Sequence, residues 1–224
     1  MSRFFYANEI ARPEDVIPYL AKQERHWRKG YSAYELAHSW IAAEGIPSPV
    51  GSVLDTCPDY ARAVLVEGLF ERDVDLRTPG RRSQTDLLAF VKLRRGDAVI
   101  AVEGKVDEPF GDRVSAWNDH SPGKERRLAA LCGSLGLRVV DVEDIRYQLL
   151  HRTASAIYEA QRYRTPRTIM LVHSFSVADT SFGDFQAFAE VMGMPVPAVN
   201  QVSAERECEG IRLRLAWVKD RPTD

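Results

Sequence analysis

The strongest pattern along the chain is a pair of apolar segments separated by a short polar one. Residues 85–93 (TDLLAFVKL) and 98–106 (AVIAVEGKV) are rich in the apolar and β-branched residues typical of strands. Only residues 94–97 (RRGD) separate them, so we expect a tight antiparallel hairpin. Residues 167–175 (RTIMLVHSF) predict a further strand, buried on both faces. Residues 211–219 (IRLRLAWVK) alternate, which predicts a half-buried or edge strand.

Helical patterns lie on both sides of this hairpin. Ser32-Ala33-Tyr34-Glu35 has the form of a capping box, and the apolar stripe after it predicts a helix that ends near Gly45. Three further helices are expected, at 124–135, at 144–163 with Asp144 as N-cap, and at 182–192. The less regular segments predict a loop at 46–58, a short helix at 59–67, and strands at 69–77 and 138–142.

This order of elements predicts an α/β fold. We expect an αβββαβ core with a central mixed sheet flanked by helices. A single domain is expected over residues 1–224, since this length is ordinary for one domain. Within it, we expect a helical lead-in at 1–31, the core at 32–175, and a C-terminal helix and strand at 176–224.

Composition excludes several classes of protein. The chain is 45% hydrophobic and 28% charged, which argues against disorder. It has no apolar run of the roughly 18 residues that a membrane span needs, and its start lacks the apolar core of a signal peptide. The three cysteines are scattered, which excludes a disulfide scaffold. We therefore expect a cytoplasmic protein without membrane contact.

The informative residues are three charged side chains in the hairpin. Glu103 and Lys105 are two apart in a strand, so they share a face. If Arg95-Gly96 forms the two-residue turn, the numbers of paired residues sum to 191, and Asp86 lies opposite Lys105. All three side chains then converge on one face of an otherwise apolar hairpin. A change of loop length would alter this register.

This cluster has two alternative interpretations, a metal site and an ion pair. A hard divalent cation such as Mg²⁺ explains two carboxylates on a covered sheet face, because it binds carboxylates together with water and phosphate oxygens. The lysine would then orient an attacking water or stabilise the charge of the transition state. The alternative is an ion pair between Asp86 and Lys105, with Glu103 solvated.

These residues carry a resemblance to a known group. The helix, the three strands, and Asp86 followed by Glu103-Gly104-Lys105 resemble the PD-(D/E)xK nuclease superfamily, whose fold is restriction-endonuclease-like. The resemblance covers roughly residues 32–175 and departs from the motif at Thr85, where proline is common. It implies that Asp86 and Glu103 are metal ligands and that Lys105 is catalytic. The cofactor implied is Mg²⁺, for which Mn²⁺ substitutes.

The resemblance also points to a carboxylate on the first helix. Many members place a metal-binding carboxylate there, and Glu35 is the matching position. Glu35 also suits a capping box with Ser32, so it is either a metal ligand or a cap, and the cap is favoured. Glu67 is the competing carboxylate, and a solvated position suits it better.

Candidate substrate-binding residues lie in two places. Gln148 and Arg152 share one face of the helix at 144–163 and could approach a metal or a phosphate, although a solvated helix face explains them as well. Residues 72–95 hold seven basic and three acidic side chains, a local excess of 7 − 3 = 4 that includes Arg81 and Arg82. Such a segment suits a surface that follows phosphates, or equally a solvated hairpin edge.

Two functions follow from these observations. The first is a metal-dependent nuclease acting on nucleic acid, with DNA expected rather than RNA and with a homodimer as a possible assembly. The second is a non-catalytic protein of the same fold that binds nucleic acid or a protein partner. His173 is expected to be a hydrogen-bonded core histidine in either case.

Overall fold

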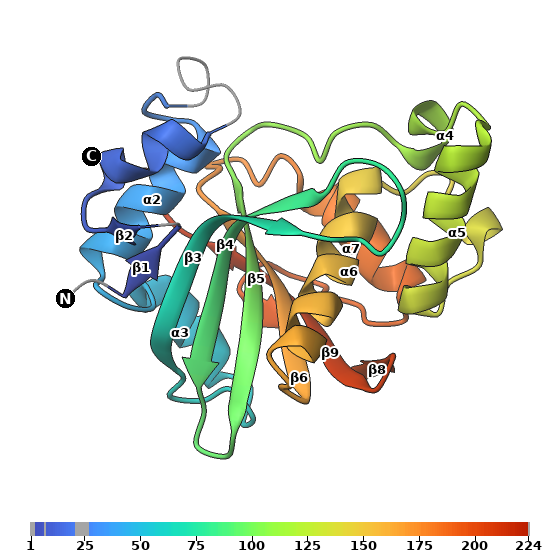
Figure 1. Cartoon of the computed structure of the whole chain (residues 1–224). Coiled ribbons are helices and arrows are strands. Elements are labelled where there is room, and N and C mark those ends of the chain that lie inside the picture. Colours follow the sequence, from blue (N-terminus) through green and yellow to red (C-terminus); the bar gives the residue numbers. More distant parts are fainter. Residues whose placement is uncertain (1–2, 7, 21–26, 224) are drawn as a thin grey trace.

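One mixed β-sheet organises the chain (Figure 1). A computed structural model describes residues 3–6, 8–20 and 27–223, and the strands within these ranges form one nine-stranded sheet. Its order is β2-β1-β3-β4-β5-β6-β9-β7, and β8 also pairs with β9. The strands are β1 (Phe4–Phe5), β2 (Glu9–Ile10), β3 (Val64–Val74), β4 (Ser83–Lys92), β5 (Asp97–Lys105), β6 (Arg167–Ser174), β7 (Gln201–Val202), β8 (Arg206–Cys208) and β9 (Ile211–Lys219).

Strand direction changes in the middle of the sheet. β3, β4 and β5 form an antiparallel meander, whereas β5, β6 and β9 run parallel to one another. A parallel neighbour requires a long crossover, and the chain between β5 and β6 supplies it with helices. β5 therefore lies at the boundary between the two halves, with both of its edges paired.

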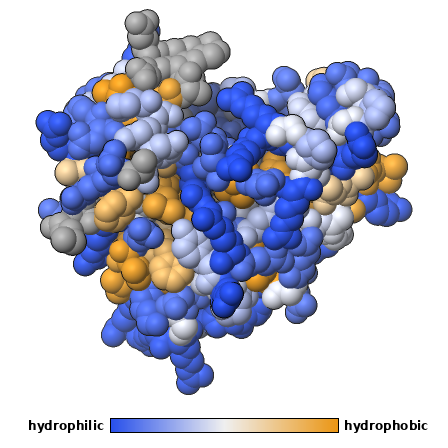
Figure 2. Space-filling view, viewed as in Figure 1, coloured by the Kyte–Doolittle hydropathy of each residue, from blue (hydrophilic) through white to orange (hydrophobic). Residues whose placement is uncertain are grey.

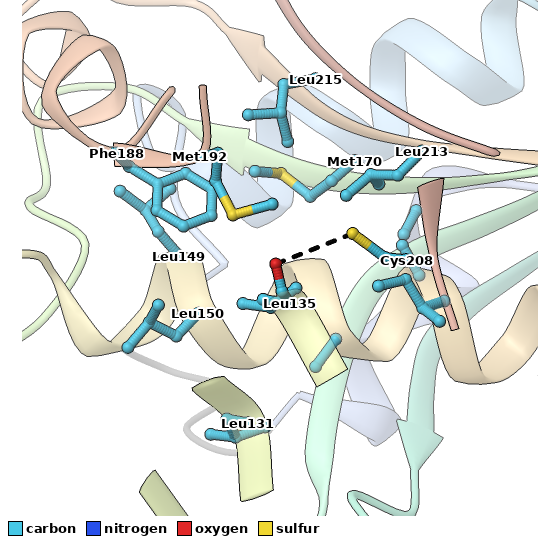
Figure 3. Packing of buried hydrophobic residues seen from close by; sticks show 14 of the residues in the cluster. Leu131, Leu135, Leu149, Leu150, Met170, Phe188, Met192, Cys208, Leu213 and Leu215 are labelled. Atoms are coloured by element: carbon cyan, nitrogen blue, oxygen red, sulfur yellow. Dashed lines mark hydrogen bonds between the residues drawn. The ribbon is translucent and has the colours of Figure 1, made fainter. Parts of the chain in front are cut away.

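Helices cover both faces of the sheet (Figure 1). One face carries α5 (Pro122–Leu135), α6 (Tyr147–Arg162) and α7 (Phe182–Val191), and Figure 3 shows the packing of leucine, methionine and phenylalanine side chains in this layer. The other face carries η1 (Pro13–Tyr19), α2 (Ser32–Ala42) and α3 (Ser48–Asp55). The short segments α4 (Val114–Trp117) and η2 (Val139–Asp141) complete the helices of the described ranges.

The α/β class and the mixed sheet flanked by helices are confirmed. The helices expected at 124–135 and 182–192 and the strands expected at 85–93, 98–106 and 167–175 are present within a few residues. Strong periodicity or continuous apolar runs marked each of these elements. Over residues 3–6, 8–20 and 27–223, no helix has both the length and the apolar character needed to cross a bilayer.

Three weaker predictions were wrong. Residues 46–58 are not a loop, because Pro49 is tolerated in the first turn of α3 and Val50, Val53 and Leu54 are buried. The helix predicted at 59–67 is absent, and β3 begins there at Val64. The strand predicted at 138–142 is the 3₁₀ helix η2. At 46–58 and 138–142, proline and β-branched residues gave local signals that tertiary packing overrode, whereas Val64 and Val66 agree with the strand that replaces the helix at 59–67.

Two further details differ from the prediction. Of the two alternatives for the strand at 211–219, the edge strand is wrong, because β6 pairs with one of its edges and β7 and β8 pair with the other. Asp144 is not an N-cap, because α6 begins at Tyr147. Of the lead-in expected at 1–31, the described part forms β1, β2 and η1, while residues 21–26 lie outside the described ranges.

The hairpin register differs from the predicted one by two. Lys92 pairs with Asp97 and Leu87 pairs with Val102, so paired numbers sum to 189. The turn therefore lies at Arg94-Arg95, and the Leu93 amide donates to the Gly96 carbonyl oxygen at 3.0 Å. Gly96 has φ +81°, a conformation that favours glycine. Because the shift is even, every side chain stays on its predicted face.

A buried histidine of β6, His173, links α2 to the residue that follows β9. The Trp40 indole donates to His173 Nδ1 at 3.1 Å, and His173 Nε2 lies 3.1 Å from Asp220 Oδ2. With Nδ1 accepting, the neutral ring carries its proton on Nε2 and donates it to Asp220. Burial lowers the pKa of His173, although Asp220 opposes the shift. The prediction of a hydrogen-bonded core histidine is confirmed.

Candidate active site

Three carboxylates occupy matched positions on three neighbouring strands. Asp86 of β4 lies one residue beyond the Leu87–Val102 pair, which places it beside Glu103 of β5. Glu71 of β3 lies between the pairs Phe70–Leu87 and Arg72–Thr85, which places it beside Asp86. The three carboxylates therefore form a row across the antiparallel half of the sheet.

The helix α6 supplies the counter-charge for this row. Arg152 donates from Nε to Glu103 Oε2 and from Nη2 to Asp86 Oδ1 at 3.4 Å. The third guanidinium nitrogen, Nη1, donates to Ser83 Oγ at 3.1 Å. The contact with Glu103 is screened from water because both residues are buried, whereas the Asp86 side chain is partly exposed to the cavity. Arg152 therefore bridges two of the three carboxylates.

Lys105 completes the network from the same strand as Glu103. Its ammonium donates to Glu103 Oε1 at 2.9 Å and to Gln148 Oε1 at 3.1 Å. Gln148 in turn donates from Nε2 to Glu103 Oε1 at 2.7 Å. The Phe110 ring lies 4.7 Å from the ammonium and covers it on one side. The predicted convergence of Asp86, Glu103 and Lys105 on one face is thus observed, although Lys105 pairs with Glu103 and not with Asp86.

The middle residue of the Glu103-Gly104-Lys105 motif faces the opposite layer. A Cβ at Gly104 would lie 3.3 Å from the Ser32 carbonyl oxygen and 3.4 Å from Leu36, both on α2. The Gly104 amide also donates to Asp86 Oδ2 at 2.9 Å. Close packing of α2 therefore requires a small residue between the glutamate and the lysine, and the backbone there positions Asp86.

Burial and charge separate the acid strengths of the three carboxylic groups. Burial and the neighbouring Glu103 carboxylate raise the pKa of Asp86 to about 7. Burial and Asp86 likewise raise the pKa of Glu71 well above its ordinary value. Burial would also raise the pKa of Glu103, but Arg152 and Lys105 outweigh it and hold that pKa below its usual value. Glu103 is therefore ionised at neutral pH, while Asp86 takes up a proton near pH 7.

The raised pKa of Asp86 has a consequence for stability. Between pH 4 and pH 7 the folded protein holds a proton on Asp86 that the unfolded chain releases, so the folded state is favoured at the lower pH. The free energy of unfolding is expected to fall by about 2 kcal/mol between pH 5 and pH 8 through this group. The Asp86→Asn variant should lose most of that pH dependence, as measured by urea unfolding at both pH values.

The control for this measurement is Asp73→Asn. Asp73 is an exposed carboxylate on the same strand as Glu71, so its removal should change the pH dependence of unfolding far less than the removal of Asp86. An Asp86→Asn protein with the full wild-type pH dependence would show that Asp86 titrates at its ordinary value.

The carboxylate row forms the floor of a cavity of about 820 Å³. The connection between β3 and β4 and the N-terminal part of α5 rim it with basic residues, and Figure 2 shows hydrophilic side chains over that connection. The Arg127 guanidinium joins the two sides of the rim by donating to Tyr147 Oη at 2.7 Å and to the Arg81 carbonyl oxygen. The charged residues that line the cavity are Glu71, Arg81, Arg82, Asp86, Glu103, Lys105, Glu108, Lys124, Arg127 and Arg152.

The predicted substrate-binding residues all line this cavity. Gln148 and Arg152 reach the carboxylates directly, so the alternative of a solvated helix face is wrong for them. Arg81 and Arg82 are exposed on the rim, where they can meet a polyanion entering the cavity.

The structure places Glu35 elsewhere. Its Oε1 accepts from the Gly30 amide at 2.8 Å, and its Oε2 accepts from the Thr223 amide at 2.7 Å and from the Thr223 hydroxyl at 2.9 Å. It is fully buried and does not line the cavity. The capping box with Ser32 is also absent, because α2 begins at Ser32 with Tyr31 before it. Glu35 instead joins two distant segments, so it is not available as a metal ligand.

Sequence reasoning missed Glu71 and the pair Ser83 and His151. Ser83 Oγ lies 2.9 Å from His151 Nδ1, and it accepts from Arg152 on its other side. Burial, and then Arg152, lower the pKa of His151 well below its ordinary value, so the ring is neutral. A strand was expected over 69–77, but the long connection after β3 left its register with β4 undetermined. No local signal therefore placed Glu71 beside Asp86.

The donor set of the cavity suits a hard divalent cation. Carboxylate oxygens are the ligands that Mg²⁺ and Mn²⁺ prefer, and three carboxylates meet here from adjacent strands. Within the described ranges, however, no group of three or more His, Cys, Asp or Glu side chains is already arranged as a coordination shell. Arg152 and Lys105 hold the carboxylate oxygens that a cation would use. Binding of a metal therefore requires rearrangement of these two cations.

Comparison with known proteins assigns the family. A family model described as a domain of unknown function, DUF6946, matches residues 9–222. The chain therefore belongs to this family. Comparisons with curated proteins and with solved structures give no match. The geometry of the cavity thus carries the functional inference.

Proposed function

We propose that this chain is a metal-dependent nuclease with a restriction-endonuclease-like core. The observation that carries the proposal is the convergence of Asp86, Glu103 and Lys105 on the floor of a cavity with a basic rim. The order α2, β3, β4, β5, α6, β6 also agrees with the αβββαβ core that the sequence resembles. Mg²⁺ is the expected cofactor, and Mn²⁺ is expected to substitute for it.

Each residue has a role in the proposed hydrolysis of a phosphodiester bond. Asp86 and Glu103 would hold the cation, which supplies Lewis-acid polarisation of a phosphoryl oxygen. Lys105 would donate to the attacking water and to a non-bridging oxygen as negative charge develops there. Gln148 fixes the lysine ammonium, because its amide oxygen accepts from Nζ. Arg81 and Arg82 would position the phosphates that flank the scissile bond.

A direct assay tests the proposal. Plasmid, single-stranded DNA and RNA are incubated with purified protein in Mg²⁺, in Mn²⁺ and in EDTA. Cleavage of at least one substrate is expected with either metal and none with EDTA. The Asp86→Asn protein should be inactive under every condition, while the Asp73→Asn protein should match wild type. Cleavage that persists in EDTA would contradict a metal-dependent mechanism.

A second candidate function has an observation of its own. Arg152 bridges Asp86 and Glu103 with its guanidinium, which neutralises the carboxylates without a metal. A protein that binds nucleic acid through its basic rim and has no hydrolytic activity would show this arrangement permanently. Such a protein would bind labelled oligonucleotides equally well with Mn²⁺ and with EDTA, and it would leave them intact.

A further inference from the structure

We propose that Glu71 is a ligand of the same divalent cation, so that the metal site is built from Glu71, Asp86 and Glu103 on three adjacent strands. This inference rests on the proposed metal-dependent function and goes beyond the residues that the sequence motif assigns. It adds a third carboxylate from β3, the strand that precedes the motif strands.

The position of Glu71 is the first support. The β3–β4 register places it beside Asp86, just as the β4–β5 register places Asp86 beside Glu103. All three side chains line the one cavity. Carboxylate oxygens are the protein ligands that Mg²⁺ and Mn²⁺ prefer.

The second support is that Glu71 is buried and has no hydrogen-bond partner among residues 3–6, 8–20 and 27–223. Only 9% of the residue is exposed, yet no residue of the described ranges donates a hydrogen bond to its carboxylate. Asp86 and Glu103, in contrast, are both bonded by Arg152. Buried carboxylates are normally paired or bound to metal, so an unpaired one that lines the cavity is available as a cation ligand.

The ion pairs of the cluster agree with this assignment. Arg152 bonds both Glu103 and Asp86, and Lys105 bonds Glu103. Neither of these two cations bonds Glu71. Among the described residues, Glu71 is therefore the carboxylate of the row that Arg152 and Lys105 leave unpaired.

The competing explanation is that Glu71 and Asp86 merely share a proton. A Mn²⁺ titration of the purified full-length protein distinguishes a metal ligand from a shared proton. The electron paramagnetic resonance signal of free Mn²⁺ measures how much of the ion is bound. Glu71→Gln keeps the shape of the side chain and removes only its charge. Glu67→Gln is the matched control, because Glu67 is on the same strand and does not line the cavity.

We expect Glu71→Gln to weaken Mn²⁺ binding at least about tenfold and Glu67→Gln to leave it within about twofold of wild type. Glu71→Gly serves as a second variant, because Glu71 has φ +51° and glycine adopts this conformation readily. It should lose Mn²⁺ affinity equally while melting no lower than wild type in EDTA.

The outcomes distinguish this inference from the proposed function. Wild-type affinity in both Glu71 variants, together with loss of Mn²⁺ binding in Asp86→Asn, would overturn the role of Glu71 and leave the metal-dependent function standing. A wild-type protein that binds no Mn²⁺ would overturn both. Weakened Mn²⁺ binding in both Glu71 variants, with wild-type binding in Glu67→Gln and with all three proteins folded by circular dichroism, supports the three-carboxylate site.

Discussion

Replacement of Lys105 by methionine is expected to lower the rate of phosphodiester cleavage by a few hundred-fold while the protein stays folded. The ammonium lies 2.9 Å from Glu103 Oε1, so it is held beside a proposed metal ligand where charge develops in the transition state. One positioned charge of this kind contributes on the order of 3–4 kcal/mol to transition-state stabilisation. Methionine removes the ammonium, which lies 4.7 Å from the Phe110 ring, and keeps an apolar side chain of similar length.

Single-turnover kinetics with saturating protein measure this effect on the chemical step. Lys92→Met is the matched control, because Lys92 forms its ion pair with Asp97 at the exposed end of the same hairpin. The control should cleave at the wild-type rate. A Lys105→Met protein that cleaves within about threefold of wild type would exclude Lys105 from the mechanism.

Of the substitutions proposed here, Arg152→Met is expected to lower the free energy of unfolding most. The guanidinium contacts Glu103, Asp86 and Ser83 within the buried layer under α6. Removal of one partner from a buried ion pair leaves an uncompensated charge and costs about 3–5 kcal/mol. Urea unfolding at pH 8 in EDTA should show this loss, and it should shrink at pH 5 because Asp86 is then protonated.

Added Mn²⁺ provides a second measurement on the Arg152→Met protein. A cation that replaces the guanidinium should raise the midpoint of thermal unfolding more in this variant than in wild type, because binding no longer requires displacement of Arg152. Arg162→Met is the control, since Arg162 is an exposed arginine of the same helix. Equal stability of the Arg152→Met and wild-type proteins in EDTA would show that the carboxylates are neutralised by other means.

The sequence could predict the face of each site residue but not its partner. Alternation in β5 places Glu103 and Lys105 together, and any even change of register keeps Asp86 on the same side. The turn position was wrong by one residue, because two basic residues and a glycine allow more than one tight turn. Because of this error, Lys105 was predicted to pair with Asp86, whereas its ammonium donates a hydrogen bond to Glu103.

Long-range pairing explains what the sequence could not predict. Glu35 bonds Thr223, which is 188 residues away, and a capping-box pattern is a purely local signal. Glu71 reaches Asp86 only through the β3–β4 register, which the intervening connection does not determine. Arg152 and Gln148 were selected as members of a helix face, but their contact with Glu103 depends on how α6 crosses β5. Tertiary packing thus decides which of several plausible polar residues share a site.

The C-terminal segment has a practical consequence for anyone who produces this protein. Asp220 accepts from His173, and Thr223 donates to Glu35, so the final residues supply partners to two side chains that have no contact with water. Deletion of residues 220–224 would leave His173 Nε2 and Glu35 Oε2 without these partners, and the shortened protein should express poorly or aggregate. A purification tag fused directly after these residues would need a flexible spacer, so that its own sequence does not pull Thr223 away from α2.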